Sequence, residues 1–362
     1  MRDQLIDEAS LGAWLEANVE GFSGPFTLTK FPSGQSNPTY RINATSGDYV
    51  LRRKPFGQLL ASAHAVDREY RLLAALNPLE FPVPAPLALC DDSNVIGSIF
   101  YIMEMARGRP YSNGALPDFD PSTRGRMYGQ LVNTLADLHT IDPEAADLAD
   151  FGKPGNYFER QVARWTRQYR DSETEYLPEM ERLIAFLPET LPEQSRTSIV
   201  HGDYRIDNVV YDGDGTLTAV LDWELATLGD PLADFSYLAM QWMMPADGAA
   251  GLAGLNLVEL GIPTLGEIVH RYSSRSGVPV ADKLDWYFAY NLFRLAGIVQ
   301  GIKKRVIDGT ASHAQAAEMA KRVPMLASAA WDFASKAGAK RRPISSRMTI
   351  TTRITPRIPD GP

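Results

Sequence analysis

Three polar residues in the second half of the chain carry side-chain oxygens that could act together on a phosphate. Asp203 and Asn208 lie five positions apart in the segment His-Gly-Asp-Tyr-Arg-Ile-Asp-Asn at 201–208. Asp222 ends the run Thr-Ala-Val-Leu at 218–221, where an unpaired buried carboxylate would be costly. Mg²⁺ takes a few protein oxygens together with phosphate oxygens. These residue types therefore suit phosphoryl transfer, in which a carboxylate orients a hydroxyl and accepts its proton.

Further motifs surround these residues in a fixed order. They are Ser-Gly-Gln-Ser-Asn-Pro-Thr-Tyr at 33–40, Tyr-Val-Leu-Arg at 49–52, Val-Asp-Arg-Glu-Tyr at 66–70, Leu-Asp-Trp-Glu at 221–224 and Gly-Asp-Pro-Leu-Ala-Asp at 229–234. With the 201–208 segment, they make the chain resemble the aminoglycoside phosphotransferase and choline kinase superfamily from about residue 31 to about residue 304. Within it, the chain most resembles the phosphotransferase branch found fused to, or encoded near, acyl-CoA dehydrogenases.

The resemblance implies an α+β, protein-kinase-like bilobal fold, with a small antiparallel-sheet N-lobe containing one main helix and a larger, mostly helical C-lobe. It also implies ATP and Mg²⁺ as cofactors. Asp203 would be the catalytic residue that faces the acceptor hydroxyl, and Asn208 and Asp222 would be the metal ligands. Glu224 stays open between a second metal site and a structural contact. Asp207 has an offset that the family does not use, and we interpret it as a surface residue.

A polar turn and a basic strand residue are the candidates for nucleotide phosphate binding. The turn residues expected to contact phosphate are Ser33, Gly34, Ser36 and Asn37. Gly34 would let the backbone approach an anion, and the other side chains offer donors. Arg52 follows two aliphatic residues and could grip two phosphates through its planar fork. Strand alternation puts Lys54 on the same face, so Lys54 is the alternative.

An acidic residue on an apolar helix face is expected to pair with that basic residue. Glu69 shares a face of the predicted helix 62–76 with Val66, Leu73 and Leu76. The resemblance further places the hinge between the lobes at Glu104 and Met105, where the backbone would bind adenine. Whether the nucleotide is ATP or GTP does not follow from these residues.

The acceptor site is the least defined part of the sequence. The resemblance points to Trp242, Tyr290 and Arg294 as substrate contacts on C-lobe helices. The branch implies a hydroxylated acyl group or its CoA thioester, and the basic residues of the predicted helix 281–305 favour an anionic acceptor. The alternatives are an aminoglycoside or other antibiotic O-phosphotransferase and, in another class, a nucleotide-binding pseudokinase module. The pseudokinase is disfavoured because all three oxygen-bearing residues are present.

The composition of the chain limits which partners and which cellular compartment we expect for it. The net charge of −8 argues against a nucleic-acid partner, because phosphate backbones require a basic surface. The single cysteine excludes an intrachain disulfide, and no apolar run approaches the roughly 18 residues of a membrane span. We therefore expect a cytoplasmic protein with a small-molecule hydroxyl acceptor and no membrane partner. The sequence does not indicate the oligomeric state.

The predicted elements follow the order of a kinase-like N-lobe and then a helical C-lobe. The expected strands are 27–31, 39–43, 49–53, 87–91, 98–105, 198–200, 207–211 and 217–222, and the expected helices are 3–19, 62–76, 123–139, 156–170, 174–187, 231–244, 255–275 and 281–305. The N-lobe is assigned to 1–105 and the C-lobe to 106–336. Residues 337–362 are rich in Arg, Pro, Ser and Thr and are expected to form a disordered basic tail.

Overall fold

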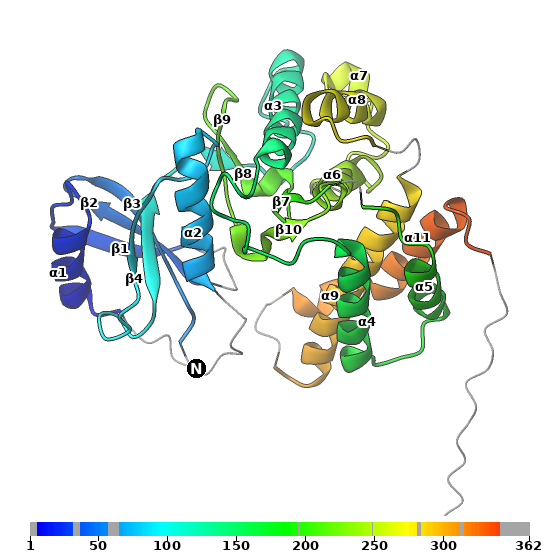
Figure 1. Cartoon of the computed structure of the whole chain (residues 1–362), viewed down its shortest axis with the longest axis horizontal. Helices are drawn as coiled ribbons and strands as arrows, with labels where there is room; N and C mark the ends of the chain where they lie inside the picture. Colours follow the sequence, from blue (N-terminus) through cyan, green and yellow to red (C-terminus); the bar gives the residue numbers. More distant parts are fainter. Residues whose placement is uncertain are drawn as a thin grey trace, which may run out of the picture.

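The protein is described by a computed structural model covering residues 6–31, 37–56, 65–194, 196–247, 249–280, 284–310 and 315–340. Its N-terminal lobe is an antiparallel sheet in the order β1-β2-β3-β5-β4 with two helices (Figure 1). The bounds are α1 Glu8–Asn18, β1 Phe26–Lys30, β2 Thr39–Ala44, β3 Gly47–Arg53, α2 Val66–Leu76, β4 Pro86–Cys90 and β5 Phe100–Glu104. This is the predicted antiparallel N-lobe, with strand ends shifted by a few residues.

Alternation along β3 sends successive side chains to opposite faces of this sheet. Leu51 is fully buried in one apolar cluster with Leu11 and Leu15 of α1. Val50 belongs instead to the cluster that contains the apolar face of α2. Figure 1 shows α1 and α2 on opposite sides of the sheet, with α2 toward the larger lobe. Arg52, two residues after Val50, therefore faces α2.

Helix α2 also forms hydrogen bonds and an ion pair with the C-terminal lobe. The guanidinium of Arg68 donates to the carbonyl oxygens of Phe151 (2.7 Å) and Ala226 (3.4 Å), and it lies 4.1 Å from the centre of the Phe151 ring. One turn along, Arg71 forms an ion pair with Asp150. The helix thus contacts the N-terminal sheet with its apolar face and the larger lobe with its arginines.

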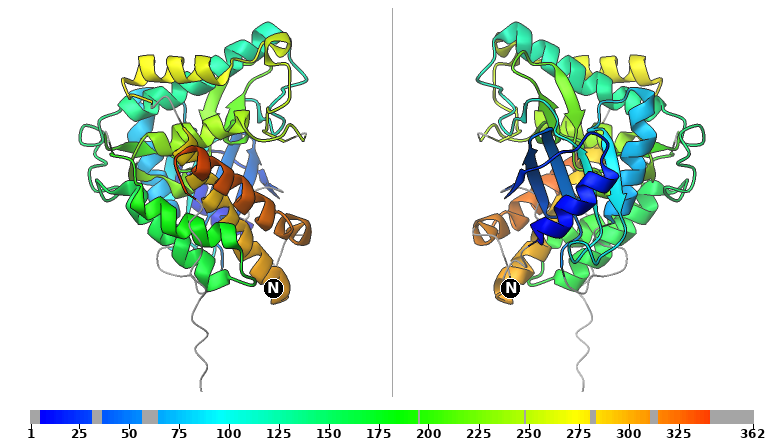
Figure 2. Two further views of the ribbon diagram at one scale, coloured as in Figure 1. Left: turned by 90° about the vertical axis from the view of Figure 1, so that its right-hand side faces the viewer. Right: turned by 90° about the vertical axis from the view of Figure 1, so that its left-hand side faces the viewer.

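The C-terminal lobe is mainly helical, with short strands at its border with the sheet (Figures 1 and 2). Its helices are α3 Pro121–Thr140, α4 Tyr157–Ser172, α5 Pro178–Glu189, α6 Leu232–Ala239, α7 Leu257–Leu260, α8 Leu265–Ser276, α9 Asp285–Ile307, α10 Ala316–Ala320 and α11 Val323–Lys336. Helices α4, α5 and α11 pack around α9. None of the helices in the described ranges combines the length and apolarity needed to span a membrane.

Five short strands carry the segments that contain the predicted catalytic residues. They are β6 Arg109–Pro110, β7 Ser198–Val200, β8 Val209–Tyr211, β9 Leu217–Val220 and β10 Thr227–Gly229. Strand β7 pairs with β10, and β8 lies between β6 and β9. The chain between β7 and β8 and the chain after β9 are therefore held side by side.

Some of the predicted elements differ from the structure. The helix expected at 255–275 is two helices, because Gly261 ends α7 in a left-handed conformation and Thr264 starts α8 with a capping box. The strand expected at 207–211 begins as a 3₁₀ turn at Ile206–Asn208. Helices α10 and α11 were not predicted. Most of the tail expected at 337–362 and the start of the helix expected at 62–76 lie outside the described residues.

Candidate active site

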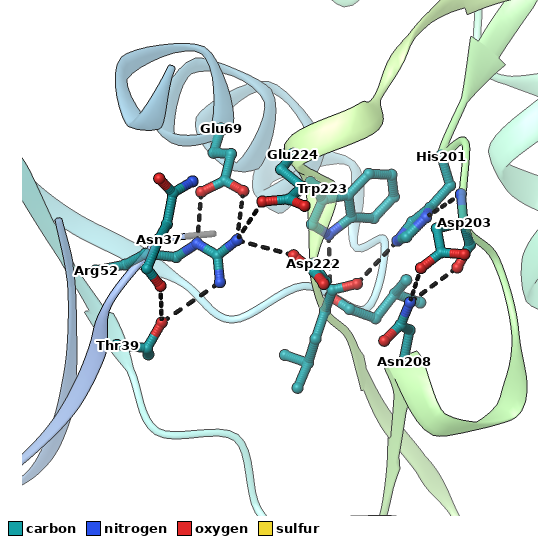
Figure 3. Close-up of polar contacts among 12 residues, drawn as sticks. Asn37, Thr39, Arg52, Glu69, His201, Asp203, Asn208, Asp222, Trp223 and Glu224 are labelled. Carbon is teal, nitrogen blue, oxygen red and sulfur yellow. Dashed lines mark hydrogen bonds and ion pairs between the residues drawn. The ribbon is translucent and has the colours of Figure 1, made fainter. Parts of the chain in front are cut away.

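The loop between β7 and β8 is held by an imidazole inside it (Figure 3). The backbone N–H of Asp203 donates to Nδ1 of His201 (3.2 Å). Nδ1 is therefore an acceptor, and the proton on Nε2 is directed to the carbonyl oxygen of Leu221 (2.8 Å). Gly202 adopts φ +84°, and a Cβ there would lie 2.8 Å from the carbonyl oxygen of Leu225. The loop thus needs both the histidine and the glycine.

A buried carboxylate on α6 also holds the loop between β7 and β8. Asp234 of α6 accepts the backbone N–H groups of His201 (2.5 Å) and Gly202 (2.8 Å). Nε2 of His139 lies 3.4 Å from the same carboxylate. Burial acts to raise the pKa of Asp234, but the hydrogen bonds from His139 and the backbone outweigh it and lower that pKa. Asp234 is therefore ionised at neutral pH and fixes two consecutive peptide units.

Asp203 and Asn208 are in direct contact. The side-chain nitrogen of Asn208 donates to the backbone oxygen of Asp203 (2.9 Å) and to its carboxylate (3.1 Å). The amide oxygen of Asn208 consequently points away from Asp203 (Figure 3). The backbone of Asn208 also accepts the N–H of Leu221 (2.8 Å), which brings the end of β9 against this loop.

Asp222 follows at the end of β9 in an uncommon backbone conformation. Its φ of 65° and ψ of 62° are left-handed, which is rare for a residue other than glycine and is frequent at functional sites. The turn after it is closed by the indole N–H of Trp223, which donates to the carbonyl oxygen of Val220 (3.0 Å). The Asp222 side chain is 39% exposed, and one oxygen accepts from Arg52 (2.8 Å).

Arg52 is the centre of the polar contacts between the lobes. It donates twice to Glu69 of α2 (2.7 and 2.9 Å), so the predicted ion pair is present. Glu224 lies 3.6 Å from the same guanidinium. Lys54, the alternative partner, pairs instead with Asp67 (3.4 Å). Among the two basic residues proposed from the sequence, Arg52 therefore occupies the position beside Glu69.

The electrostatics of this pair follow from its burial. Burial raises the pKa of the Glu69 carboxyl, and the adjacent Arg52 opposes that shift. Burial also acts to lower the pKa of Arg52, but the charges of Glu69, Tyr101 and Asp222 and the hydrogen bonds to Glu69 together outweigh it, so this pKa is raised. Tyr101 donates a further hydrogen bond to Glu69 (3.4 Å). The guanidinium remains charged beside its carboxylates.

The oxygen donors of the site fit a magnesium ion. Carboxylate oxygens of Glu69, Asp222 and Glu224 lie within 4.8 Å of one another, with one guanidinium among them. Glu69 is 3% exposed and engaged with Arg52, whereas Asp222 has the most exposed side chain of the three. Carboxylate and amide oxygens are the hard donors that Mg²⁺ prefers, and the hydrogen bond from Leu221 N–H to the Asn208 backbone oxygen joins the segments that carry Asp222 and Asn208. Asp222 and Asn208 are the residues predicted to hold it, and that role stays a prediction.

Only some of the other residues predicted to contact the nucleotide lie in the described part of the chain. Asn37 is buried beside Arg52, and its backbone oxygen accepts the hydroxyl of Thr39 (3.1 Å; Figure 3). Glu104 ends β5, where its N–H donates to Ala85 (2.9 Å), and the partly buried Met105 follows it. Ser33, Gly34 and Ser36 lie outside the described residues. Their role stays a prediction.

Arg294 of α9 contacts the loop between β7 and β8 rather than open solvent. Its Nη2 donates to the carbonyl oxygen of Gly202 (2.7 Å), and its side chain is buried. The guanidinium lies between the rings of Trp165 (5.5 Å) and Tyr237 (5.2 Å). Cation–π contacts of this kind help to compensate a buried charge. These contacts tie Arg294 to the loop between β7 and β8, and a substrate role for it stays a prediction.

The other two predicted substrate residues are also buried. Trp242 donates its indole N–H to the carbonyl oxygen of Pro263 (2.7 Å) and packs edge-on against Tyr128. Tyr290 stacks on Trp286, with ring centres 5.9 Å apart. These contacts are those of core aromatic residues, and a substrate role for either stays a prediction.

Two neighbours of Asp203 were not identified from the sequence. The Nε of Arg205 lies 3.7 Å from the Asp203 carboxylate, and its Nη2 lies 3.1 Å from Asp207. Asp207, expected on the surface, has a side chain only 26% exposed, and burial raises its pKa. Burial and the charge of Asp203 also raise the pKa of Tyr237. Arg205 and Asp207 lie inside the 201–208 motif, but their side-chain directions depend on the folded loop.

Comparison with known proteins places this geometry in a family. The model of the phosphotransferase enzyme family matches residues 27–267. The chain belongs to the phosphotransferase enzyme family. A Ralstonia eutropha structure assigned provisionally as an aminoglycoside phosphotransferase superposes on this phosphotransferase with a TM-score of 0.84 and 44% identity, covering 92% of this chain and 99% of that one. The structure of the aminoglycoside phosphotransferase APH(4)-Ia with ADP and hygromycin B has a TM-score of 0.55 at 16% identity, and the match covers 90% of this chain and 98% of that one. The two proteins share the fold.

Curated relatives of the phosphotransferase are longer proteins. Acyl-CoA dehydrogenase family member 10 of Mus musculus is 44% identical over 319 residues, which is 87% of this chain and 30% of the relative. Acyl-CoA dehydrogenase family member 11 of Rattus norvegicus is 38% identical over 315 residues, 85% of this chain and 40% of the relative. The phosphotransferase thus spans less than half of the length of these relatives.

Proposed function

We propose that this phosphotransferase moves the γ-phosphoryl group of ATP to a hydroxyl of a small molecule, with Mg²⁺ as cofactor. The observation that carries the proposal is the convergence of Asp203, Asn208 and Asp222 opposite the Arg52–Glu69 pair. A carboxylate, an amide oxygen and a guanidinium then face one space from both lobes. The ADP in the APH(4)-Ia complex supports an adenine nucleotide in the same fold.

Each residue has one task in this reaction. Asp203 orients the acceptor hydroxyl and accepts its proton, as the acceptor oxygen bonds to the γ-phosphorus. The bond from the γ-phosphorus to the bridging oxygen breaks, and its electron pair stays on ADP. Mg²⁺, when held by Asn208 and Asp222, supplies positive charge to the phosphate oxygens. Arg52 is kept in place by Glu69 to bind the same phosphates, so catalysis rests on positioning and charge neutralisation.

The acceptor that we propose is a hydroxyacyl group, free or as its CoA thioester. The support is the family name of the relatives, which are acyl-CoA dehydrogenase family members at up to 44% identity. The basic residues of α9 do not add to it, contrary to the sequence-based argument. Lys303 pairs with Glu175, and Lys304 pairs with Asp308. Arg294 is directed to the loop.

A second acceptor class is supported by a different observation. The Ralstonia eutropha protein, assigned provisionally as an aminoglycoside phosphotransferase, is 44% identical over nearly its whole length. An aminoglycoside is therefore the competing acceptor for the same chemistry. A pseudokinase has no such support, because Asp203, Asn208 and Asp222 are all retained and lie together.

The test measures binding first and transfer second. Calorimetry with ATP and GTP at millimolar Mg²⁺ determines the nucleotide, and a coupled ADP assay then scans hydroxyacyl-CoA esters, free hydroxy acids, aminoglycosides and choline. Asp203→Ala should bind MgATP like the wild type and release no ADP with the acceptor. Full activity of Asp203→Ala would refute the assignment of this residue. Absence of nucleotide binding to the wild type would refute the kinase proposal itself.

A further inference from the structure

The catalytic aspartate has a cation beside it whose task is not explained by the loop contacts. Arg205 approaches the Asp203 carboxylate to 3.7 Å through Nε, yet this distance is too long for a hydrogen bond. That Nε is buried and makes no hydrogen bond to any of the described residues. A buried donor without an acceptor is costly, so its presence calls for an explanation, and a catalytic role of the residue is one.

The remainder of the Arg205 side chain is anchored but accessible. Its Nη2 is tied to Asp207 at 3.1 Å, and the side chain is 41% exposed. Burial acts to lower the pKa of Arg205, but the negative surroundings, which include Asp203, Asp207 and Asp222, raise it. The guanidinium therefore lies within the field of both the proton acceptor and the proposed metal ligand, and it keeps its charge. A phosphoryl group in transfer would occupy the space between those two carboxylates.

Three other basic residues of the described structure, near the site, are engaged with other partners. Arg52 is held by Glu69 and Asp222 at the nucleotide side. Lys54 pairs with Asp67, and Arg294 donates to the Gly202 carbonyl behind the loop. Of these described basic residues, Arg205 is thus the one whose guanidinium lies beside the Asp203 carboxylate, at 3.7 Å.

We propose that Arg205 is a further catalytic residue, which binds an equatorial oxygen of the transferring phosphoryl group and neutralises the charge that develops on it. This inference rests on the proposed kinase function. In the transition state the bond to the acceptor oxygen is forming, the bond to the bridging oxygen is breaking, and the hydroxyl proton passes to Asp203. Arg205 exchanges no proton or electron. Its contribution is that of an arginine finger supplied within the same chain.

The test uses a transition-state mimic, so that the acceptor need not be known. Calorimetry measures the dissociation constant of MgADP with and without aluminium fluoride, which imitates the planar phosphoryl group. For the wild type we expect fluoride to tighten binding strongly. For Arg205→Met we expect this tightening to fall on the order of 100-fold, with MgADP affinity unchanged, because charge stabilisation at the reacting centre is lost. Arg205→Lys should keep part of the tightening, because lysine retains the charge and loses the planar fork.

A matched control separates catalysis from folding. Arg275 is also half-exposed and paired with an aspartate, Asp137, and it lies on α8 away from the loop. Arg275→Met should behave like the wild type in both titrations. Fluorine NMR of the bound aluminium fluoride provides a second signal, which should shift in Arg205→Met and stay unchanged in Arg275→Met.

The outcomes distinguish this inference from the proposed function. Equal tightening in wild type and Arg205→Met, or none in a wild type that binds MgADP, would overturn the role of Arg205 and leave the kinase standing. Loss of MgADP affinity together with the tightening would also overturn it, because the residue would then be structural. Failure of the wild type to bind MgADP or MgATP would instead reject the kinase proposal.

Discussion

Replacing Asp230 with asparagine should stabilise the protein at neutral pH, and the gain should shrink as the pH falls. Asp230 precedes α6 and is fully buried. One of its oxygens accepts the N–H of Leu232 (2.8 Å), and the other has no hydrogen-bond partner among the described residues. Burial raises the pKa of Asp230 to about 6, which the single backbone hydrogen bond only partly opposes.

The sign and size of the effect follow from that pKa. Between about pH 4 and pH 6 the folded protein keeps the proton on Asp230 while the unfolded chain has lost it, so raising the pH favours unfolding. The difference from the usual value of 3.8 is about two pKa units, or about 3 kcal/mol. Asparagine carries no such proton, and its oxygen can still accept from Leu232. The variant should therefore avoid a cost of up to about 3 kcal/mol, fully expressed above pH 7.

Urea unfolding of both proteins at pH 5, 6, 7 and 8 measures this difference. The free energy of unfolding of Asp230→Asn minus that of the wild type should grow from pH 5 to pH 7 and then level off. The exposed Asp118, paired with Arg109, supplies a control: Asp118→Asn should not show this growth. A difference that is independent of pH, or that decreases as pH rises, would show that burial does not control the proton on Asp230.

Two further changes address the site. Glu69→Gln keeps one acceptor for Arg52 but removes the buried counter-charge. The free energy of unfolding should therefore fall by on the order of 3 kcal/mol, and MgATP should bind at least about tenfold more weakly. Unchanged values in thermal unfolding and calorimetry would contradict the role of the pair. Asp234→Asn places an amide N–H against two backbone donors, so kcat should fall on the order of 10- to 100-fold with nucleotide affinity retained. A wild-type kcat in the ADP assay would show that the loop does not depend on Asp234.

Local sequence patterns were sufficient to predict the contact between Arg52 and Glu69. The strand period of two places Arg52 on the face of β3 that covers α2, and the helix period places Glu69 on the buried face of α2. Both patterns act within a few residues, and packing the helix on the sheet brings the two side chains together. The order of the motifs likewise indicated the bilobal fold, which the comparisons confirm.

The contact between Arg294 and Gly202 could not be predicted in the same way. Its contact, Gly202, is 92 residues away in the sequence, and it depends on how α9 docks against the loop between β7 and β8. A basic residue on an aromatic helix face is compatible with a substrate contact and equally with a buried cation between rings. The direction of Arg205 depends in the same way on the turn that precedes β8, because its backbone is extended and its neighbours converge only in the folded loop.

Helix α2 belongs to the N-terminal sheet by its apolar face and to the larger lobe by Arg68 and Arg71. In protein kinases the corresponding ion pair is a point of control, because displacement of its helix separates lysine and glutamate. Here the helix contacts the larger lobe at two successive turns, through Arg68 and Arg71, and Glu69, which pairs with Arg52, lies between them. A displacement of α2 that separated Arg52 from Glu69 would therefore also have to break the contacts of both arginines with the larger lobe.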